Sequence, residues 1–190
     1  MSGWRVGFAL CGSFCTLHRV ILQMEELVKQ GHTVIPIFSE AVRTIDTRFG
    51  TASSWAERVT DICGRAPLVT LTEVEPIGPR DMLDILVVAP CTGSTLCHLA
   101  AGDYSKTVPL AVKSHLRRER PVVLAVSTND ALSGSFSSIA NLKNRKHIYL
   151  VPMKQDDPKA KPNSLVADFT RIGDTVEAAM EGQQLQPLFL

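Results

Sequence analysis

Hydrophobic residues gather in five short runs along the chain, and longer segments of mixed character separate these runs. The runs span 5–11, 33–38, 85–89, 121–126 and 147–151. Each has few or no polar interruptions, which is typical of strands that are buried on both faces of a parallel sheet. The pattern therefore predicts five strands.

The segments between the runs show the spacing of amphipathic helices. The best example carries Leu17, Val20, Ile21, Met24, Leu27 and Val28, and Gly31 is placed to end it. Further helices are expected at 53–63, 94–102, 107–118 and 135–145, and a short extended piece at 68–72. A last helix is expected over Leu165, Val166, Phe169, Ile172, Val176 and Ala179, with Asn163 or Ser164 as its N-cap. Strands that alternate with helices predict a three-layer, doubly wound α/β fold with a mainly parallel sheet, of flavodoxin-like or Rossmann-like type. Because the 190 residues contain no internal repeat or linker, we expect a single domain over 1–190.

Two prolines modify this picture, because proline has no N–H group to donate to a strand ladder. Pro36 lies inside the second run, so that strand is expected at a sheet edge or at a bulge. Pro90 follows the third run directly and is expected to end its strand. Beyond it the chain opens into a polar loop of small residues.

Short loops rich in glycine and hydroxyl residues follow the predicted strands. They lie at 12–14, at Ser39, at 90–95 and at 127–130. In an open α/β sheet such loops meet at the carboxyl edge, where N–H groups and a helix start can hold a phosphate, and hydroxyls a ribityl or ribose chain. The candidate cofactor-binding residues are Gly12, Ser13, Phe14, Ser39, Pro90, Thr92, Gly93, Thr95, Ser127 and Asn129. For the loop at 90–95 alone, an ordinary strand–helix connection remains the alternative.

The kind of nucleotide follows from two missing motifs. The first loop lacks the second glycine of the dinucleotide-binding fingerprint, and the chain has no Walker sequence. The pattern therefore favours a mononucleotide.

Composition excludes several classes of function. A net charge of +1 gives no electrostatic basis for binding nucleic acid. No apolar run reaches the roughly 18 residues that a membrane-spanning helix needs, and the first residues lack the layout of a signal peptide. Five cysteines at irregular positions indicate reduced thiols and a cytoplasmic protein. No cysteine or histidine group has zinc-ligand spacing, so no metal site is predicted.

Candidate catalytic groups are few, and the catalytic residues stay unknown from the sequence. Asn129 and Asp130 are the best placed to contact a reacting ring, although either can instead cap the following helix. Cys91 lies in a candidate loop without a local base. His98 follows on the next helix, where it faces a ligand or the surface. The polar loop 154–163 is a lid, an interface or a plain connection.

Four segments carry a resemblance to a known family. They are Glu-Pro-Ile-Gly-Pro at 75–79, Ala-Pro-Cys-Thr-Gly-Ser-Thr-Leu at 89–96, the segment 121–132, and Gln-Asp-Asp-Pro at 155–158 together with 161–167. With these segments the chain resembles the B subunits of dipicolinate synthases, within the flavoprotein family that includes the flavin-dependent cysteine decarboxylases. The resemblance covers nearly the whole chain.

The match to the wider family is partial. Its signature Pro-Ala-Ser-Ala-Asn-Thr holds FMN; Pro90 and Thr95 match this signature, whereas 91–94 differ. Asn129 resembles the asparagine of the family's Pro-x-Met-Asn substrate motif. The decarboxylases carry a histidine shortly before the signature strand, and this chain has Glu-Pro-Ile-Gly at 75–78 instead. The resemblance therefore does not extend to the usual base of the decarboxylases.

The resemblance to the B subunits implies an oxidoreductase subunit that acts with an A subunit in sporulating bacteria. Dihydrodipicolinate would lose two hydrogens and become dipicolinate, with FMN on this chain and NADP through the A subunit. The resemblance also implies homo-oligomers and a place in the cytoplasm of the mother cell. Lys154 or Lys113 would help to bind the two carboxylates of the substrate, unless both are ordinary surface lysines. Two other functions stay open: a non-catalytic assembly or activating partner of the A subunit, and a flavin-dependent cysteine decarboxylase.

Overall fold

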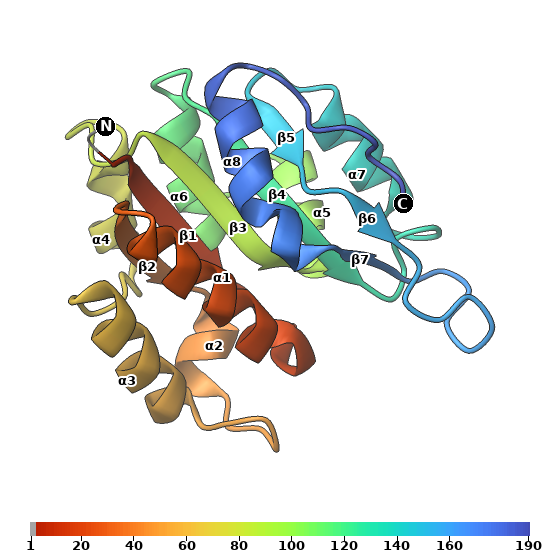
Figure 1. Ribbon diagram of the computed structural model, residues 1–190, viewed down its shortest axis with the longest axis horizontal. Helices are drawn as coiled ribbons and strands as arrows, with labels where there is room; N and C mark the ends of the chain where they lie inside the picture. The colour runs from red at the N-terminus through yellow and green to blue at the C-terminus, as the bar shows by residue number, and fades with distance from the viewer. Residues whose placement is uncertain (1–2) are drawn as a thin grey trace.

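The structure is a computed structural model that describes residues 3–190, and its centre is a seven-stranded, mostly parallel sheet (Figure 1). The strands are β1 (Arg5–Leu10), β2 (Thr33–Phe38), β3 (Ile85–Cys91), β4 (Val122–Thr128), β5 (Ile148–Leu150), β6 (Met153–Lys154) and β7 (Leu165–Ala167). Five of them run parallel in the order β2-β1-β3-β4-β5. The hairpin of β6 and β7 attaches antiparallel to the end of β4. The predicted flavodoxin-like α/β fold is confirmed.

Helices cover both faces of the sheet, which gives three layers. One face carries α1 (Leu17–Lys29), α3 (Ala52–Cys63) and α8 (Ile172–Met180), and the other carries α5 (Gly93–Ala101), α6 (Thr107–Leu116) and α7 (Phe136–Lys143). The connections hold the short helices α2 (Glu40–Thr44) and α4 (Leu71–Val74) and the 3-10 turns η1 (Phe14–Thr16), η2 (Glu75–Ile77) and η3 (Phe169–Arg171).

Each central strand contributes to both hydrophobic layers in alternation. In β3, Ile85 and Val87 belong to the layer under α1, α3 and α8, whereas Leu86 and Val88 belong to the layer under α5, α6 and α7. Because successive side chains of a strand point to opposite faces, a strand with helices on both faces has to be apolar throughout. This explains why the strand runs are uninterrupted in the sequence.

The two prolines behave differently in the sheet. Among the strands, β2 pairs with β1 alone, so Pro36 lies in an edge strand, as predicted. On the open side of β2, the N–H of Phe38 donates to the carbonyl of Leu68 (2.9 Å), and the N–H of Leu68 donates to the carbonyl of Pro36 (2.9 Å). The prediction that Pro90 ends its strand is wrong. β3 continues to Cys91, and a shift of register before this residue lets the ladder pass the missing N–H.

The predicted helix over 165–179 is wrong in its first part. Its first three residues form β7, in which the first and third are buried and the second is less so, which is the two-residue period of a strand. The helix α8 begins at Ile172. Neither Asn163 nor Ser164 caps it; Asp168 caps the turn η3 in front of it instead.

β4 is longer than predicted, because the hairpin extends its pairing. Ser127 and Thr128 pair with β7, so only Asn129 and Asp130 of the predicted loop lie outside the strand. The hairpin also carries the polar loop 155–164 to the carboxyl end of β4. The end of β4 and the loop 155–164, which are far apart in the sequence, thus meet at one edge of the sheet.

Asp84, directly before β3, ties this strand to β1 at the amino ends of the parallel strands. Its Oδ2 accepts a hydrogen bond from the backbone N–H of Arg5 (2.8 Å), and its Oδ1 accepts one from Nη2 of the same residue (2.6 Å). The side-chain hydrogen bond from Arg5 is the main cause of a lowered pKa at Asp84. The ionised carboxylate therefore stabilises the folded chain.

We expect Asp84→Asn to lower the free energy of unfolding by about 1 to 2 kcal/mol at pH 7, because the pair is partly exposed to solvent. The folded pKa lies below the unfolded value of about 3.9, so the contribution is complete above that pH and is lost as the pH falls through the folded pKa. Urea unfolding of both chains at pH 7 and near pH 3 checks this. A deficit of the variant that stays constant into acid would contradict the ion pair as its cause.

Candidate functional site

Two neighbouring cavities open at the carboxyl ends of β1, β3 and β4. Open α/β sheets bind ligands at the point where the strand order reverses, which in this order lies between β1 and β3. The first cavity, of about 390 Å³, lies between the turn after β1, Ser39 after β2, and the start of α5. The second, of about 660 Å³, lies between the turn after β1, the end of β4 and the loop 155–164. Gly12 and Thr92 line both cavities, so the two meet at the reversal point.

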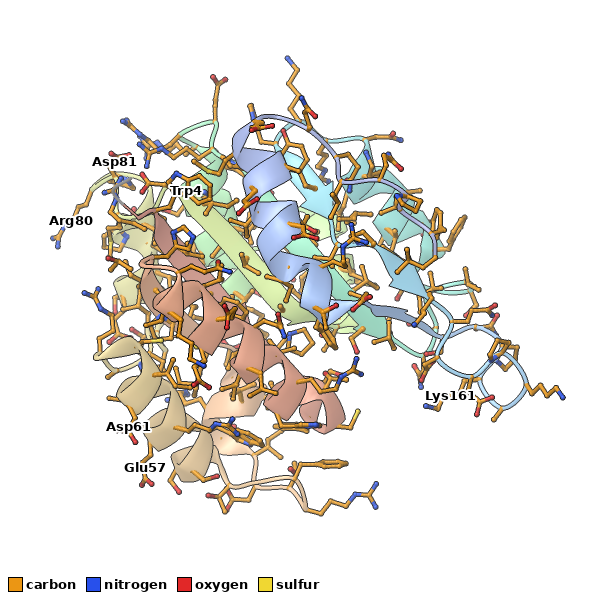
Figure 2. The ribbon with its side chains drawn as sticks, in the orientation of Figure 1. Trp4, Glu57, Asp61, Arg80, Asp81 and Lys161 are labelled. Carbon is orange, nitrogen blue, oxygen red and sulfur yellow. The ribbon has the colours of Figure 1, made fainter. Side chains whose placement is uncertain are left out.

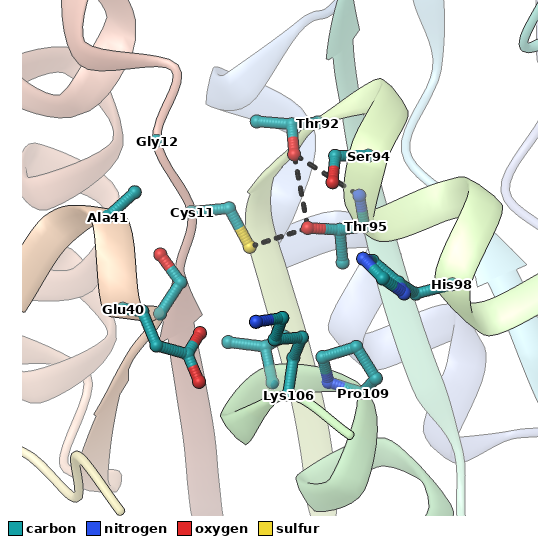
Figure 3. A pocket seen from close by; sticks show the side chains of 12 residues that line it. Cys11, Gly12, Glu40, Ala41, Thr92, Ser94, Thr95, His98, Lys106 and Pro109 are labelled. Carbon is teal, nitrogen blue, oxygen red and sulfur yellow. Dashed lines mark hydrogen bonds between the residues drawn. The ribbon is translucent and has the colours of Figure 1, made fainter. Parts of the chain in front are cut away.

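Hydroxyl groups form one wall of the first cavity (Figure 3). Thr92 is the N-cap of α5, and its Oγ1 lies 3.1 Å from Oγ1 of Thr95. The Thr95 hydroxyl donates to Sγ of Cys11 (3.3 Å), which joins the start of α5 to the end of β1. Ser94 is exposed to the cavity in the first turn of α5, where the N–H groups have no partner within the helix. These groups and the positive end of the helix dipole favour an anion.

Glu40 and Lys106 face this wall across the first cavity, and His98 lines the cavity from α5 itself (Figure 3). Lys106 lines it, and so does His98, whose Nδ1 lies 2.9 Å from Oδ2 of Asp103. Glu40 is the acid of the cavity, and its Oε1 accepts hydrogen bonds from the N–H (3.2 Å) and the hydroxyl (3.0 Å) of Thr107. Burial alone would raise the pKa of Glu40, but hydrogen bonds, including those from Thr107, and the charge of Lys106 lower it overall. The cavity therefore combines two basic side chains with one carboxylate that is already hydrogen-bonded.

Two serines join opposite walls of the second cavity. The Oγ atoms of Ser13 and Ser127 lie 3.0 Å apart, so the turn after β1 meets the end of β4 across β3. The hydroxyl of Thr16 donates to the carbonyl of Ser13 (2.8 Å) and holds this turn in place. Asn129 lines the cavity just beyond β4. The second cavity is thus polar, with hydroxyl groups on both sides and an amide just beyond β4.

Asp130 turns away from the lining of both cavities. Its carboxylate accepts hydrogen bonds from the hydroxyls of Thr128 (2.5 Å) and Ser135 (2.9 Å), and the bond from Thr128 is the main cause of its lowered pKa. Gly93 packs against the same groups, because a methyl group there would lie 2.7 Å from Oγ1 of Thr128 and 3.0 Å from Oδ1 of Asp130. Asp130 therefore holds the start of α5 against the end of β4. Of the two predicted catalytic candidates, only Asn129 faces a cavity.

Seven of the predicted cofactor-binding residues line a cavity. They are Gly12, Ser13, Ser39, Thr92, Thr95, Ser127 and Asn129. The other three do not: Pro90 is buried within β3, Phe14 packs on the layer under α1, and Gly93 contacts the Asp130 group. The predicted loops thus converge on a shared, open hollow. Cofactor binding by these residues stays a prediction.

Burial changes the interpretation of two cysteines. Contrary to the prediction, Cys91 does not lie in a loop; it is the fully buried last residue of β3 and lines neither cavity. Burial raises its pKa well above the usual range. Cys11 lines the first cavity, but burial raises its pKa to about 11. Both are therefore neutral thiols near pH 7, and neutral thiols are poor nucleophiles.

Sequence reasoning missed the basic side chains that line the cavities. Lys106 lines the first cavity, and Arg19 and Lys161 line the second. The sequence gives no signal for Arg19 or Lys106, because helix packing decides which way a surface cation points. The lysines suggested by the resemblance line neither cavity: Lys154 is exposed in β6, and Nζ of Lys113 lies over a tyrosine ring at 4.9 Å.

Within residues 3–190, no helix combines the length and the apolar character that crossing a membrane requires. The same part of the chain holds no group of three or more histidine, cysteine, aspartate or glutamate side chains arranged to bind a metal ion.

Comparison with known proteins identifies close relatives. Residues 1–181 match the model of the family described as Flavoprotein. The chain is 40% identical over 190 residues to the dipicolinate synthase B subunit of Bacillus subtilis (strain 168), and the match covers 100% of this chain and 95% of that protein. The crystal structure of the dipicolinate synthase B subunit from Bacillus halodurans C shows 41% identity and a TM-score of 0.91, over 100% of this chain and 97% of that chain.

A more distant solved structure shares the fold. The FMN-dependent cysteine decarboxylase SpaF is 16% identical, with a TM-score of 0.70 over 94% of this chain and 97% of that chain. At that identity the likeness concerns the fold alone. The resemblance drawn from the sequence motifs is confirmed by the family model and by the two relatives of about 40% identity. The chain therefore belongs to the flavoprotein family and, within it, to the dipicolinate synthase B subunits.

Proposed function

We propose that this chain binds FMN across the two cavities and acts with an A subunit in the oxidation of dihydrodipicolinate to dipicolinate. The observation that carries the proposal is the pair of cavities that share Gly12 and Thr92 at the reversal point of the sheet. The first cavity offers a helix start, hydroxyl groups and a lysine to a phosphate, and the second offers hydroxyl and amide groups to a ring. Membership of the flavoprotein family supports a flavin as the ligand.

The first cavity fits the phosphate of FMN. Hydroxyls of Ser39, Thr92 and Ser94, the unpaired N–H groups at the start of α5, and the cation of Lys106 supply the donors that a phosphate needs. The carboxylate of Glu40 is the one repulsive group, and its hydrogen bonds to Thr107 hold it on the far wall. The donor set is therefore compatible with a bound phosphate.

The second cavity fits the ring end of the same molecule. The ribityl chain would pass Gly12 and Thr92, where small side chains leave room between the cavities. Ser127 and Asn129 would hydrogen-bond the polar edge of the ring or the substrate. FMN, when bound, would supply the hydride acceptor, and the ring would release one proton to solvent as it loses two hydrogens and becomes aromatic. The chain would supply binding and orientation.

Titration of the isolated chain with FMN, riboflavin and NADPH in separate experiments tests the proposal. We expect FMN to bind most tightly and riboflavin to bind at least about tenfold more weakly, because charge-assisted hydrogen bonds to the phosphate contribute roughly 1.5 to 3 kcal/mol. Fluorescence quenching of the flavin gives both affinities. A chain that binds neither flavin, or that prefers NADPH, would contradict it.

A non-catalytic role as an activating partner of the A subunit is the second candidate. It is favoured by Asp130, whose carboxylate is engaged by two hydroxyls and lines neither cavity, and by the amide of Asn129, which is a poor proton acceptor. A colourless chain that still raises the activity of the A subunit would support this role over the first. In either case we place NADP on the A subunit, and homo-oligomers and the mother-cell cytoplasm belong to the same proposal.

The decarboxylase alternative gains no support from the site. The segment that stands where the decarboxylases carry a histidine forms η2, Glu75–Ile77, and no residue of η2 is among those that line either cavity. The imidazole that would act as the base has no replacement at that position.

A further inference from the structure

The second cavity carries a guanidinium group that no acid neutralises. Arg19 lies in the first turn of α1, and it forms no ion pair with a carboxylate anywhere in residues 3–190. Its guanidinium lies over the ring of buried Phe169, 5.3 Å from the ring centre, which orients the group without using its N–H donors. Those donors remain available to a ligand.

The position of Arg19 in its helix is itself unfavourable. The first turn of α1 contains no acidic residue, and a cation there opposes the helix dipole. The cation–π contact with Phe169 offsets this cost, so the position of Arg19 is close to neutral for the stability of the chain. The contact explains how the side chain is oriented, but it does not explain why the first turn of α1 carries a cation at this position.

A second cation reaches the cavity from the opposite side. Lys161 lies in the loop 155–164, which projects beyond β6 and β7 (Figure 2). The loop is shaped by internal hydrogen bonds, from Nε2 of Gln155 to the carbonyl of Pro162 (2.8 Å) and from the N–H of Lys161 to the carbonyl of Asp157 (2.7 Å). Nζ of Lys161 also lies 2.8 Å from Oδ2 of Asp156, which lines the same cavity. Asp156 therefore competes with any ligand for this cation.

The charges of the second cavity favour an acid with two carboxylates. Two cations on different elements flank a wall of hydroxyl and amide groups, and one carboxylate, that of Asp156, offsets one of them. A guanidinium binds a carboxylate through two parallel hydrogen bonds, whereas an ammonium acts as a point charge. Arg19 is therefore the stronger anchor, and Lys161 is the weaker one.

We infer that Arg19 and Lys161 form a carboxylate-binding subsite in the second cavity for a small planar dicarboxylic acid, with Asp156 as an internal competitor. This inference rests on the proposed function, because it places the substrate beside the ring end of the flavin. It assigns the two carboxylates to two cations that lie far apart in the sequence.

Binding of dipicolinate to the chain, with and without saturating FMN and in metal-free buffer, tests the subsite by calorimetry. We expect Arg19→Gln to weaken dipicolinate binding about 10- to 100-fold and Lys161→Gln about 3- to 10-fold, since hydrogen bonds between charged groups contribute roughly 1.5 to 3 kcal/mol before competition. Asp156→Asn should tighten binding about threefold, because it frees Lys161. A gain of affinity from removing an acid is not expected of a merely structural change.

Arg48→Gln is the matched control. Arg48 also lies over a phenylalanine ring, that of Phe49 at 4.8 Å, but it lines neither cavity, so dipicolinate binding should not change. Pyridine-2-carboxylate, which has one carboxylate, should bind the unaltered chain more weakly than dipicolinate. In Arg19→Gln the difference in affinity between dipicolinate and pyridine-2-carboxylate should be smaller.

Three results would overturn the subsite: equal dipicolinate affinity in Arg19→Gln and the unaltered chain, no dipicolinate binding by a chain that binds FMN, or a loss of FMN affinity in Arg19→Gln with riboflavin affinity unchanged. The last result would assign Arg19 to the flavin phosphate. A chain that binds no flavin but binds dipicolinate through Arg19 would overturn the proposed flavin function and support the subsite.

Discussion

Replacing Ser94 with aspartate should lower FMN affinity about 100-fold without destabilising the chain. Ser94 is exposed, lines the first cavity and is the second residue of α5, so a carboxylate there would stand beside the proposed phosphate. At an effective dielectric constant of about 20, two like unit charges roughly 4 to 8 Å apart repel by about 2 to 4 kcal/mol, and each 1.4 kcal/mol is tenfold in affinity. An acid in the first turn of a helix is itself favourable, so the fold should not suffer.

Ser53→Asp is the control for this variant. Ser53 is also the exposed second residue of a helix with a threonine N-cap, but no residue of its helix, α3, lines either cavity. It should gain the same small stabilisation and keep its FMN affinity. Riboflavin affinity should be the same in all three chains, because riboflavin carries no phosphate. If Ser94→Asp bound FMN as tightly as Ser53→Asp, the phosphate would not lie in the first cavity.

Replacing Gly78 with alanine should destabilise the chain by about 3 kcal/mol or more, which is the largest stability effect that we expect. Gly78 follows η2 and lies against α6, where its N–H donates to Oγ of Ser114 (2.9 Å). A methyl group on Gly78 would lie 2.0 Å from the carbonyl oxygen of Ser114, so backbone would have to move. Overpacking of this kind costs roughly 1 to 3 kcal/mol and more when backbone has to shift.

Gly173→Ala provides the comparison for the glycine at position 78. Gly173 lies in the first turn of α8, and a methyl group there meets no atom within 4 Å. Alanine should therefore raise stability by about 0.5 kcal/mol, through helix propensity and a less flexible unfolded chain. Urea denaturation of both variants measures the two effects. A Gly78→Ala chain as stable as the unaltered one would show that α6 and η2 are not closely packed.

The packing of Gly78 against α6 gives a physical reason for one of the four segments that carry the family resemblance. The sequence Glu-Pro-Ile-Gly-Pro at 75–79 contributed to the resemblance without any function that its residue types suggested. In the structure it forms η2, and Oγ of Ser114 donates to the carbonyl of Glu75 (2.6 Å) as well as accepting from Gly78. The segment is therefore a packing motif, and its glycine is needed for the close approach of α6.

The central strands and most helices were predictable, because burial on both faces leaves uninterrupted apolar runs and amphipathic helices leave a regular spacing. The β6–β7 hairpin was not predictable. Leu165 and Val166 continue a spacing that suits a helix, and three residues are too few to show the period of a strand. Pairing with Ser127 and Thr128 decides their conformation, and a pairing between distant segments leaves no local trace.

The candidate site, like the fold, was predictable only in part. The loops that meet at the cavities were predictable, because the carboxyl ends of parallel strands share one edge of the sheet. Which side chains face inward was not, since Asp130 and Gly93 belong to those loops but contact each other instead of a cavity. Arg19 and Lys161 escaped prediction because nothing in their local sequence separates them from ordinary surface cations.

The attachment of the β6–β7 hairpin outside the parallel part of the sheet affects how relatives can diverge. The first cavity is built on the ends of β1 and β3 and on α5, whereas Lys161 and Asp156 belong to an appended segment whose strand β7 pairs with the last two residues of β4. Exchange of this segment between homologues would therefore change the lining of the proposed subsite and leave the first cavity intact. Chimeras made at 155–164 are the natural starting point for retargeting the scaffold to new substrates.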